Sequence, residues 1–97
     1  MAAVWFITGV SSGFGTEIAL QALASGQRVI GTVRNRTRAA SQVSAIEDKG
    51  GKILELDVTD AAACSTVLKE AESLYGQVDV LVNNAGYGLL GAVEDLG

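Results

Sequence analysis

The sequence contains no histidine and only one cysteine, and its 97 residues carry a formal net charge of −4. A lone cysteine excludes an internal disulfide and a metal cluster built on cysteines. Cys64 lies among apolar residues at helical spacing, and we expect it to be a small buried packing residue. The negative net charge predicts no global attraction to nucleic acid or to an anionic membrane.

Long apolar runs are also missing, and no segment approaches the length of a membrane span. The chain opens directly on its first predicted strand, with no basic, apolar, cleavable leader. We therefore expect a cytoplasmic protein. The length fits one domain or part of one, and the apolar fraction of 48% with 19% charged residues is ordinary for a globular chain.

What the sequence has is a glycine-rich stretch at residues 8–15, TGVSSGFG. It follows an apolar run at 2–7 that predicts a buried strand. It precedes a helical pattern at 16–25 in which apolar residues recur in two rows, Phe14, Ile18 and Ala22 in one and Ala19 and Leu23 in the other. The first N–H groups of a helix lack intrahelical partners, so this order predicts an anion site. A structural turn without a ligand is the alternative.

Each glycine of this stretch has an expected role. Gly9 allows the tight turn out of the strand, Gly13 the close approach of a pyrophosphate, and Gly15 close packing of the helix on the strand. Two rival motifs fit part of the stretch. Residues 9–13 satisfy G-x-S-x-G, the nucleophile elbow of serine hydrolases, but the chain has no histidine base and too little upstream sequence for an oxyanion hole. A Walker-type phosphate loop fails because no lysine follows Gly13 or Gly15.

The remaining pattern predicts three more strands, at 28–33, 52–56 and 78–82, and two more helices. One helix runs over 37–49 with Thr37 as its N-cap, and the other runs to residue 75 from the N-cap Asp60. Their predicted buried stripes are Ala39, Val43 and Ile46 in the first, and Cys64, Val67, Leu68, Ala71 and Leu74 in the second.

Four strands alternating with three helices predict an α/β fold, a Rossmann-like doubly wound parallel sheet with strand order 3-2-1-4. Winding reverses between strands 1 and 4, so a ligand crevice is expected at their carboxyl ends. Residues 8–15 lie on one side of it and residues 83–86 on the other.

The end of the second strand indicates which dinucleotide would bind. NAD-binding folds usually carry an acid there, bonded to the ribose 2′-hydroxyl. Here Val33 is followed by Arg34, whose guanidinium fork suits a phosphate, and Ser11 and Ser12 offer hydroxyl groups from the loop. This favours NADP(H) over NAD(H). Arg36 and Arg38 are weaker candidates, and a solvated turn is the alternative for all three arginines.

Three motifs in order, TGVSSGFG at 8–15, Asp57-Val58, and NNAG at 83–86, resemble the short-chain dehydrogenase/reductase family. The resemblance implies that residues 9–15 cradle the pyrophosphate and that Asp57 and Val58 meet the adenine. It also implies that Asn83, Ala85 and Gly86 line the ribose region while bracing the fourth strand against Thr8. The residues predicted to bind the cofactor are thus Gly9, Ser11, Ser12, Gly13, Phe14, Gly15, Arg34, Asp57, Val58, Asn83, Ala85 and Gly86.

The family's catalytic serine and Tyr-x-x-x-Lys, which lie downstream of the NNAG motif, have no counterpart here. Asp79 follows Tyr75 at the lysine spacing, and Gly91 follows Tyr87. The simplest interpretation is an inactive N-terminal, cofactor-binding part of an NADP(H)-dependent oxidoreductase that interconverts an alcohol and a carbonyl. A non-catalytic NAD(P)-binding or regulatory module is the alternative, and a nucleotide-sugar epimerase or dehydratase is disfavoured by NNAG. The fourth strand would form an open edge through which the chain is expected to self-associate.

Overall fold

The computed structural model describes residues 2–84 and contains four strands and three helices in alternation. The strands are β1 (Val4–Ile7), β2 (Arg28–Val33), β3 (Lys52–Glu55) and β4 (Val80–Val82). The helices are α1 (Gly13–Ala24), α2 (Ala40–Asp48) and α3 (Ala61–Tyr75). All strand pairs are parallel and the sheet order is β3-β2-β1-β4, so the predicted fold and order are confirmed.

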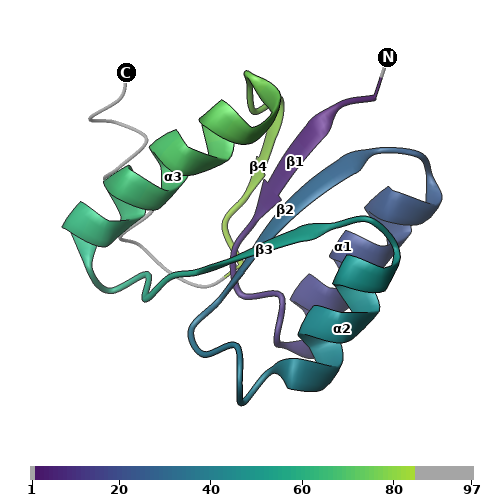
Figure 1. Ribbon diagram of the computed structural model, residues 1–97, viewed down its shortest axis with the longest axis horizontal. Helices are drawn as coiled ribbons and strands as arrows, with labels where there is room; N and C mark the ends of the chain where they lie inside the picture. The colour runs from purple at the N-terminus through teal and green to yellow at the C-terminus, as the bar shows by residue number, and fades with distance from the viewer. Residues whose placement is uncertain (1, 85–97) are drawn as a thin grey trace.

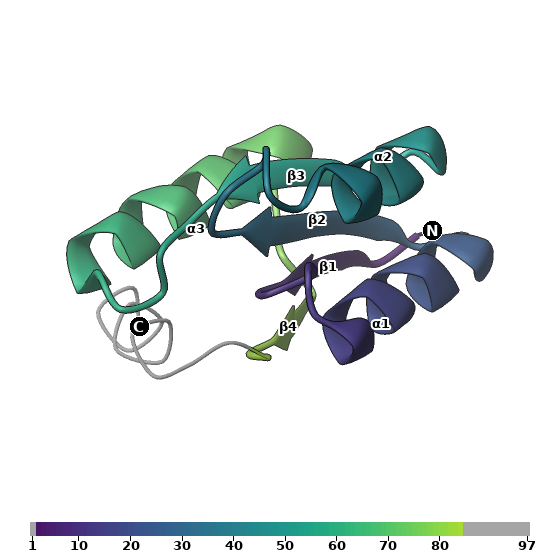
Figure 2. The ribbon, with the colours of Figure 1, turned by 90° about the horizontal axis from the view of Figure 1, so that it is seen from below.

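The sheet is covered on both faces. Helices α1 and α2 lie side by side on one face and α3 lies on the other (Figures 1 and 2). Each face therefore has its own apolar core. Under α3 the core includes Phe6, Ile30 and Cys64, and under α1 and α2 it includes Ile7, Val29 and Ile46. Strand β2 is buried from Val29 to Val33, as expected for a strand packed on both faces.

Several predicted details of the helices are confirmed. The stripe Ala39, Val43 and Ile46 is buried, and Asp60 caps α3 by accepting a hydrogen bond from the amide of Ala63. Cys64 is buried in the core as predicted. Burial raises the pKa of the Cys64 thiol, and the nearby Asp60 carboxylate adds to the effect. None of the helices within residues 2–84 has the length and apolar composition needed to cross a bilayer.

Other details were wrong. Helix α1 begins at Gly13 instead of residue 16, because Ser12 acts as its N-cap. Thr37 does not cap α2, which begins at Ala40 without a side-chain cap; the amide of Thr37 instead donates to the Asn35 side chain in the preceding turn. Phe14 is 80% exposed because it lies in the first turn of α1, past the carboxyl ends of the strands. Leu74, in the last turn of α3, is 39% exposed.

Candidate functional site

The carboxyl ends of the four parallel strands lie along one edge of the sheet, and the segments that leave them build the candidate site. The first is the loop between β1 and α1. Gly9 has a φ of 69°, a left-handed conformation that glycine adopts without the steric cost of a side chain. A Cβ on Gly15 would lie 2.3 Å from the carbonyl oxygen of Gly9, so helix and loop approach each other as closely as backbones allow. The predicted roles of both glycines in shaping the loop are confirmed.

The N-terminus of α1 keeps amide hydrogens available. The Ser12 hydroxyl accepts from the amide of Gly15 at 3.4 Å. In the described part of the chain, the amides of Ser11, Gly13 and Phe14 have no protein acceptor. A Cβ on Gly13 would meet no protein atom within 4 Å, so the protein's own packing does not require glycine there. Three free donors beside open space, at the positive end of the helix dipole, suit an anion.

The loop is fixed from two sides. On the β2 side, the Gly9 amide donates to the hydroxyl of Thr32 at 3.4 Å and the Val10 amide to the Thr32 carbonyl at 2.9 Å. On the β4 side, the Thr8 amide donates to the Val82 carbonyl at 3.0 Å. The Thr8 hydroxyl in turn accepts from the amide of Asn84 at 3.0 Å. These contacts brace the end of β4 against Thr8.

Asn84 is the site residue that the sequence did not single out. Its side-chain amide donates to the Gly9 carbonyl at 3.1 Å and to the Ser12 hydroxyl at 2.9 Å. The Ser12 hydroxyl donates its own hydrogen to the same carbonyl at 3.0 Å. Ser12 therefore holds the loop together, whereas the Ser11 side chain, equally exposed, makes no hydrogen bond to the protein within residues 2–84. The signal in the sequence was the position of Asn84, the second residue after the fourth strand, at the switch point of the sheet.

The second side of the site is formed where β2 and β3 end. The Arg34 guanidinium lies 3.6 Å from the Asp57 carboxylate. The hydroxyl and the amide of Thr59 both donate to Asp57, at 2.6 and 3.0 Å. These hydrogen bonds lower the pKa of Asp57, slight burial opposes them, and the charge of Arg34 adds a smaller lowering. Asp57 is therefore an anion at neutral pH, held in the turn before α3.

One cavity of about 360 Å³ joins these elements. Asn84 lines this cavity together with six residues that the sequence predicted to bind the cofactor. These are Gly9, Ser11, Ser12, Arg34, Asp57 and Val58. Gly13 lines a neighbouring groove between α1 and α2, and Gly15 is buried against Gly9. Asn83 leaves β4 within reach of the Thr8 hydroxyl, at 3.5 Å. Ala85 and Gly86 lie outside the described residues.

The residues present fit the adenosine and pyrophosphate half of a dinucleotide. The free amides at the start of α1 suit a pyrophosphate, and the open space at Gly13 leaves room for one. The guanidinium of Arg34 and the hydroxyl of Ser11 line the same cavity as Asp57, between the ends of β2 and β3.

Comparison with known proteins agrees with this geometry. A family model described as short chain dehydrogenase matches residues 3–96. The chain is 38% identical over 96 residues to the oxidoreductase BOA17 of Botryotinia fuckeliana, covering 99% of this chain and 35% of the relative. It therefore spans about a third of that relative's length.

Solved structures show the same likeness. A short-chain dehydrogenase from Streptomyces avermitilis superposes with a TM-score of 0.77 at 46% identity, over 89% of this chain and 31% of that one. A variant of actinorhodin polyketide ketoreductase, solved with NADPH, superposes with a TM-score of 0.79 at 31% identity. The match covers 89% of this chain and 34% of the ketoreductase. The chain belongs to the short-chain dehydrogenase family.

Proposed function

We propose that residues 1–97 form the first part of a nucleotide-binding domain and bind NADP(H) in preference to NAD(H). The observation that carries the proposal is the single cavity in which the glycine loop, Arg34 and Asp57 meet. The amides of Gly13 and Phe14 would hold the pyrophosphate, and Asp57 with the Val58 backbone would meet the adenine. Asn83, Ala85 and Gly86 would line the ribose region.

Arg34 would select the phosphorylated cofactor. Its side chain is 81% exposed at the end of β2, where an acid would be expected in a protein that binds the free ribose hydroxyl. A guanidinium can donate two hydrogen bonds to one phosphate, and charge-assisted bonds of this kind are about twice as strong as neutral ones. The Ser11 hydroxyl lines the same cavity and adds a donor.

The test is calorimetric titration of NADPH and NADH into the protein and its Arg34→Ala variant. We expect Arg34→Ala to weaken NADPH binding about 10- to 100-fold, the loss of one or two charged hydrogen bonds, and to change NADH binding less than about threefold. Arg28→Ala, at the opposite end of β2, removes the same charge far from the cavity and is the matched control. Equal losses for the two cofactors in Arg34→Ala would refute the proposed preference.

The reaction proposed for the whole protein is interconversion of an alcohol and a carbonyl, in which the nicotinamide would carry the hydride. Within residues 1–97 the tyrosines are not followed by lysine at the family spacing, so this part alone is expected to bind cofactor without turnover. The second candidate is a non-catalytic NAD(P)-binding module. A Tyr-x-x-x-Lys in sequence following residue 97, together with loss of ketone reduction when that tyrosine becomes Phe, would support the oxidoreductase.

Self-association through β4 is a further part of the proposal. Strand β4 lies at the edge of the described sheet, and its three residues, Val80, Leu81 and Val82, are half-buried. An edge with apolar side chains favours pairing with another strand. Concentration-dependent sedimentation of the chain would support pairing through this edge, and a monomer at all concentrations would contradict it. The cytoplasmic location expected from sequence stays a prediction.

A further inference from the structure

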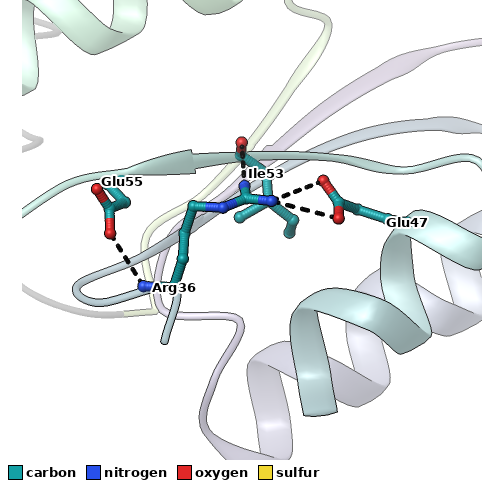
Figure 3. Close-up of polar contacts among 4 residues, drawn as sticks. All are labelled: Arg36, Glu47, Ile53 and Glu55. Atoms are coloured by element: carbon teal, nitrogen blue, oxygen red, sulfur yellow. Dashed lines mark hydrogen bonds and ion pairs between the residues drawn. The ribbon is translucent and has the colours of Figure 1, made fainter. Parts of the chain in front are cut away.

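Three arginines alternate in the segment after β2, and the structure separates them. Arg34 and Arg38 line a second hollow of about 580 Å³ beside the cavity, together with Ser11 and Asn35. Arg36, between them, reaches to β3 and α2 (Figure 3). Its guanidinium is thus committed to protein groups, which does not favour the phosphate-binding role considered for it from sequence.

Arg36 contacts three separate parts of the fold. Its backbone amide donates to the Glu55 carboxylate at 3.0 Å. One end of its guanidinium donates to the carbonyl oxygen of Ile53, on the edge strand β3, at 3.1 Å. The other end donates to both carboxylate oxygens of Glu47 in α2, at 3.1 and 3.3 Å (Figure 3). The planar guanidinium, with its donors in a fixed fork, makes both contacts at once.

The same turn is also fixed from within. The Asn35 side chain accepts hydrogen bonds from the amides of Thr37 and Arg38, at 2.9 and 3.1 Å. Together with the contacts of Arg36, these bonds fix the backbone of the turn from residue 35 to residue 38. Arg34 and Arg38 are each two residues from Arg36, so both are carried by a turn whose centre is anchored to β3 and α2.

We propose that Arg36 is a positioning residue: it anchors the turn at 34–38 so that Arg34 and Arg38 face the hollow together, and it thereby sets the preference for a ribose 2′-phosphate. This inference rests on the proposed function of Arg34. A turn held in its binding conformation loses less conformational entropy when a ligand binds, so anchoring raises affinity without any direct contact. The effect is confined to ligands that engage the turn.

Charge supports the same role. Glu47 and Glu55 both lie beside the turn. Carboxylates without a nearby positive charge there would repel the ribose 2′-phosphate and weaken its binding. Arg36 pairs with Glu47 at 3.1 Å, and the two side chains are each 42% exposed. Exposed ion pairs contribute little to stability, so removing Arg36 is expected to leave the protein folded.

The test uses two adenosine ligands that differ at the ribose, adenosine 2′,5′-bisphosphate and adenosine 5′-monophosphate. Both engage the adenine and 5′-phosphate positions, and only the first carries the 2′-phosphate. In calorimetric titrations we expect Arg36→Ala to weaken the bisphosphate about tenfold and the monophosphate less than about twofold. Arg36→Lys keeps the charge but not the fork, and we expect it to recover part of the loss.

Arg28→Ala, outside the turn, is the matched control and should leave both affinities unchanged. An equal loss for both ligands in Arg36→Ala would make Arg36 a general structural residue and overturn the inference. No loss for either ligand would overturn it as well. If the unmodified protein did not prefer the bisphosphate, both the proposed function and the inference would fail. If it did prefer the bisphosphate and Arg36→Ala kept that preference, the inference alone would fail.

Discussion

Arg34 and Asp57 lie 3.6 Å apart across the ends of β2 and β3, so two residues predicted to contact different parts of the cofactor are paired with each other. The pair is exposed, with side chains 81% and 42% accessible. An exposed pair of this kind is weak. The pair would therefore cost little to break if a phosphate binds Arg34 as proposed.

The first prediction concerns the titration of Asp57. The hydrogen bonds from Thr59 are the main cause of its lowered pKa, and Arg34 is a minor one. We therefore expect Thr59→Val to raise the pKa of Asp57 more than Arg34→Ala does, as measured by NMR titration of the carboxyl group. A larger rise in Arg34→Ala would mean that the ion pair dominates instead.

The same shift predicts how stability depends on pH. A carboxyl group whose pKa is lower in the folded state stabilises the fold above its unfolded value, about 3.9, and that stabilisation is lost as the pH falls through the folded value. Asp57→Asn should therefore be less stable than the unmodified protein at pH 7, and the difference should shrink as the pH falls below about 4. Urea unfolding at a series of pH values measures this. A difference that does not change with pH would contradict the prediction.

The second prediction separates two glycines of the same loop. Gly15→Ala would place its Cβ 2.3 Å from the Gly9 carbonyl oxygen, a backbone atom that cannot move aside, and we expect a loss of stability of about 3 kcal/mol or more. Gly13→Ala meets no protein atom and replaces glycine in a helix, so its stability should rise by up to about 1 kcal/mol. If the pyrophosphate approaches Gly13, cofactor binding should nevertheless weaken. Unfolding curves and NADPH titrations of both variants test this. Unchanged NADPH affinity in Gly13→Ala would refute the proposed contact between the pyrophosphate and Gly13.

The sequence was sufficient to predict the layers, the strand order and most of the cavity. Apolar strands and helical stripes determine which elements form, and the handedness of parallel connections leaves few topologies for them. The glycine spacing, Arg34 and Asp57 were then placed at one edge because all parallel strands end there. These predictions depended on patterns within short segments and on general rules for connecting parallel strands.

What the sequence did not predict depends on contacts between distant segments. Asn84 is 75 positions from Gly9, and its hydrogen bond to that carbonyl follows only once β1 and β4 are neighbours. Arg36 looks like its two neighbouring arginines in sequence, and only the position of α2 shows that it binds Glu47. Phe14 fits a helical stripe by spacing, but the stripe continues past the end of the sheet.

The third prediction tests how β2 accommodates the loop after β1. A Cβ on Gly31 would lie 2.9 Å from both γ-methyl groups of Val10, which is fully buried. Gly31→Ala should therefore cost about 1–3 kcal/mol through overpacking. Val10→Ala leaves space at the same point and should also destabilise the protein. The double variant should be more stable than the sum of the two single effects implies, by about 1 kcal/mol or more in urea unfolding. Additive effects would show that the two residues do not compete for this space.

The fourth prediction concerns Asn84, whose side-chain amide joins the end of β4 to the glycine loop. Asn84→Ala removes donors to the Gly9 carbonyl and the Ser12 hydroxyl, and we expect a loss of about 1–2 kcal/mol in urea unfolding. Because Ser12 caps α1, the free amides of that helix should also become less well ordered, and NADPH binding should weaken. Asn84→Asp keeps the size of the side chain but, when ionised, cannot donate to the Gly9 carbonyl, so we expect it also to be less stable than the unmodified protein. Unchanged stability in Asn84→Ala would show that the hydrogen bonds of this side chain contribute nothing to stability.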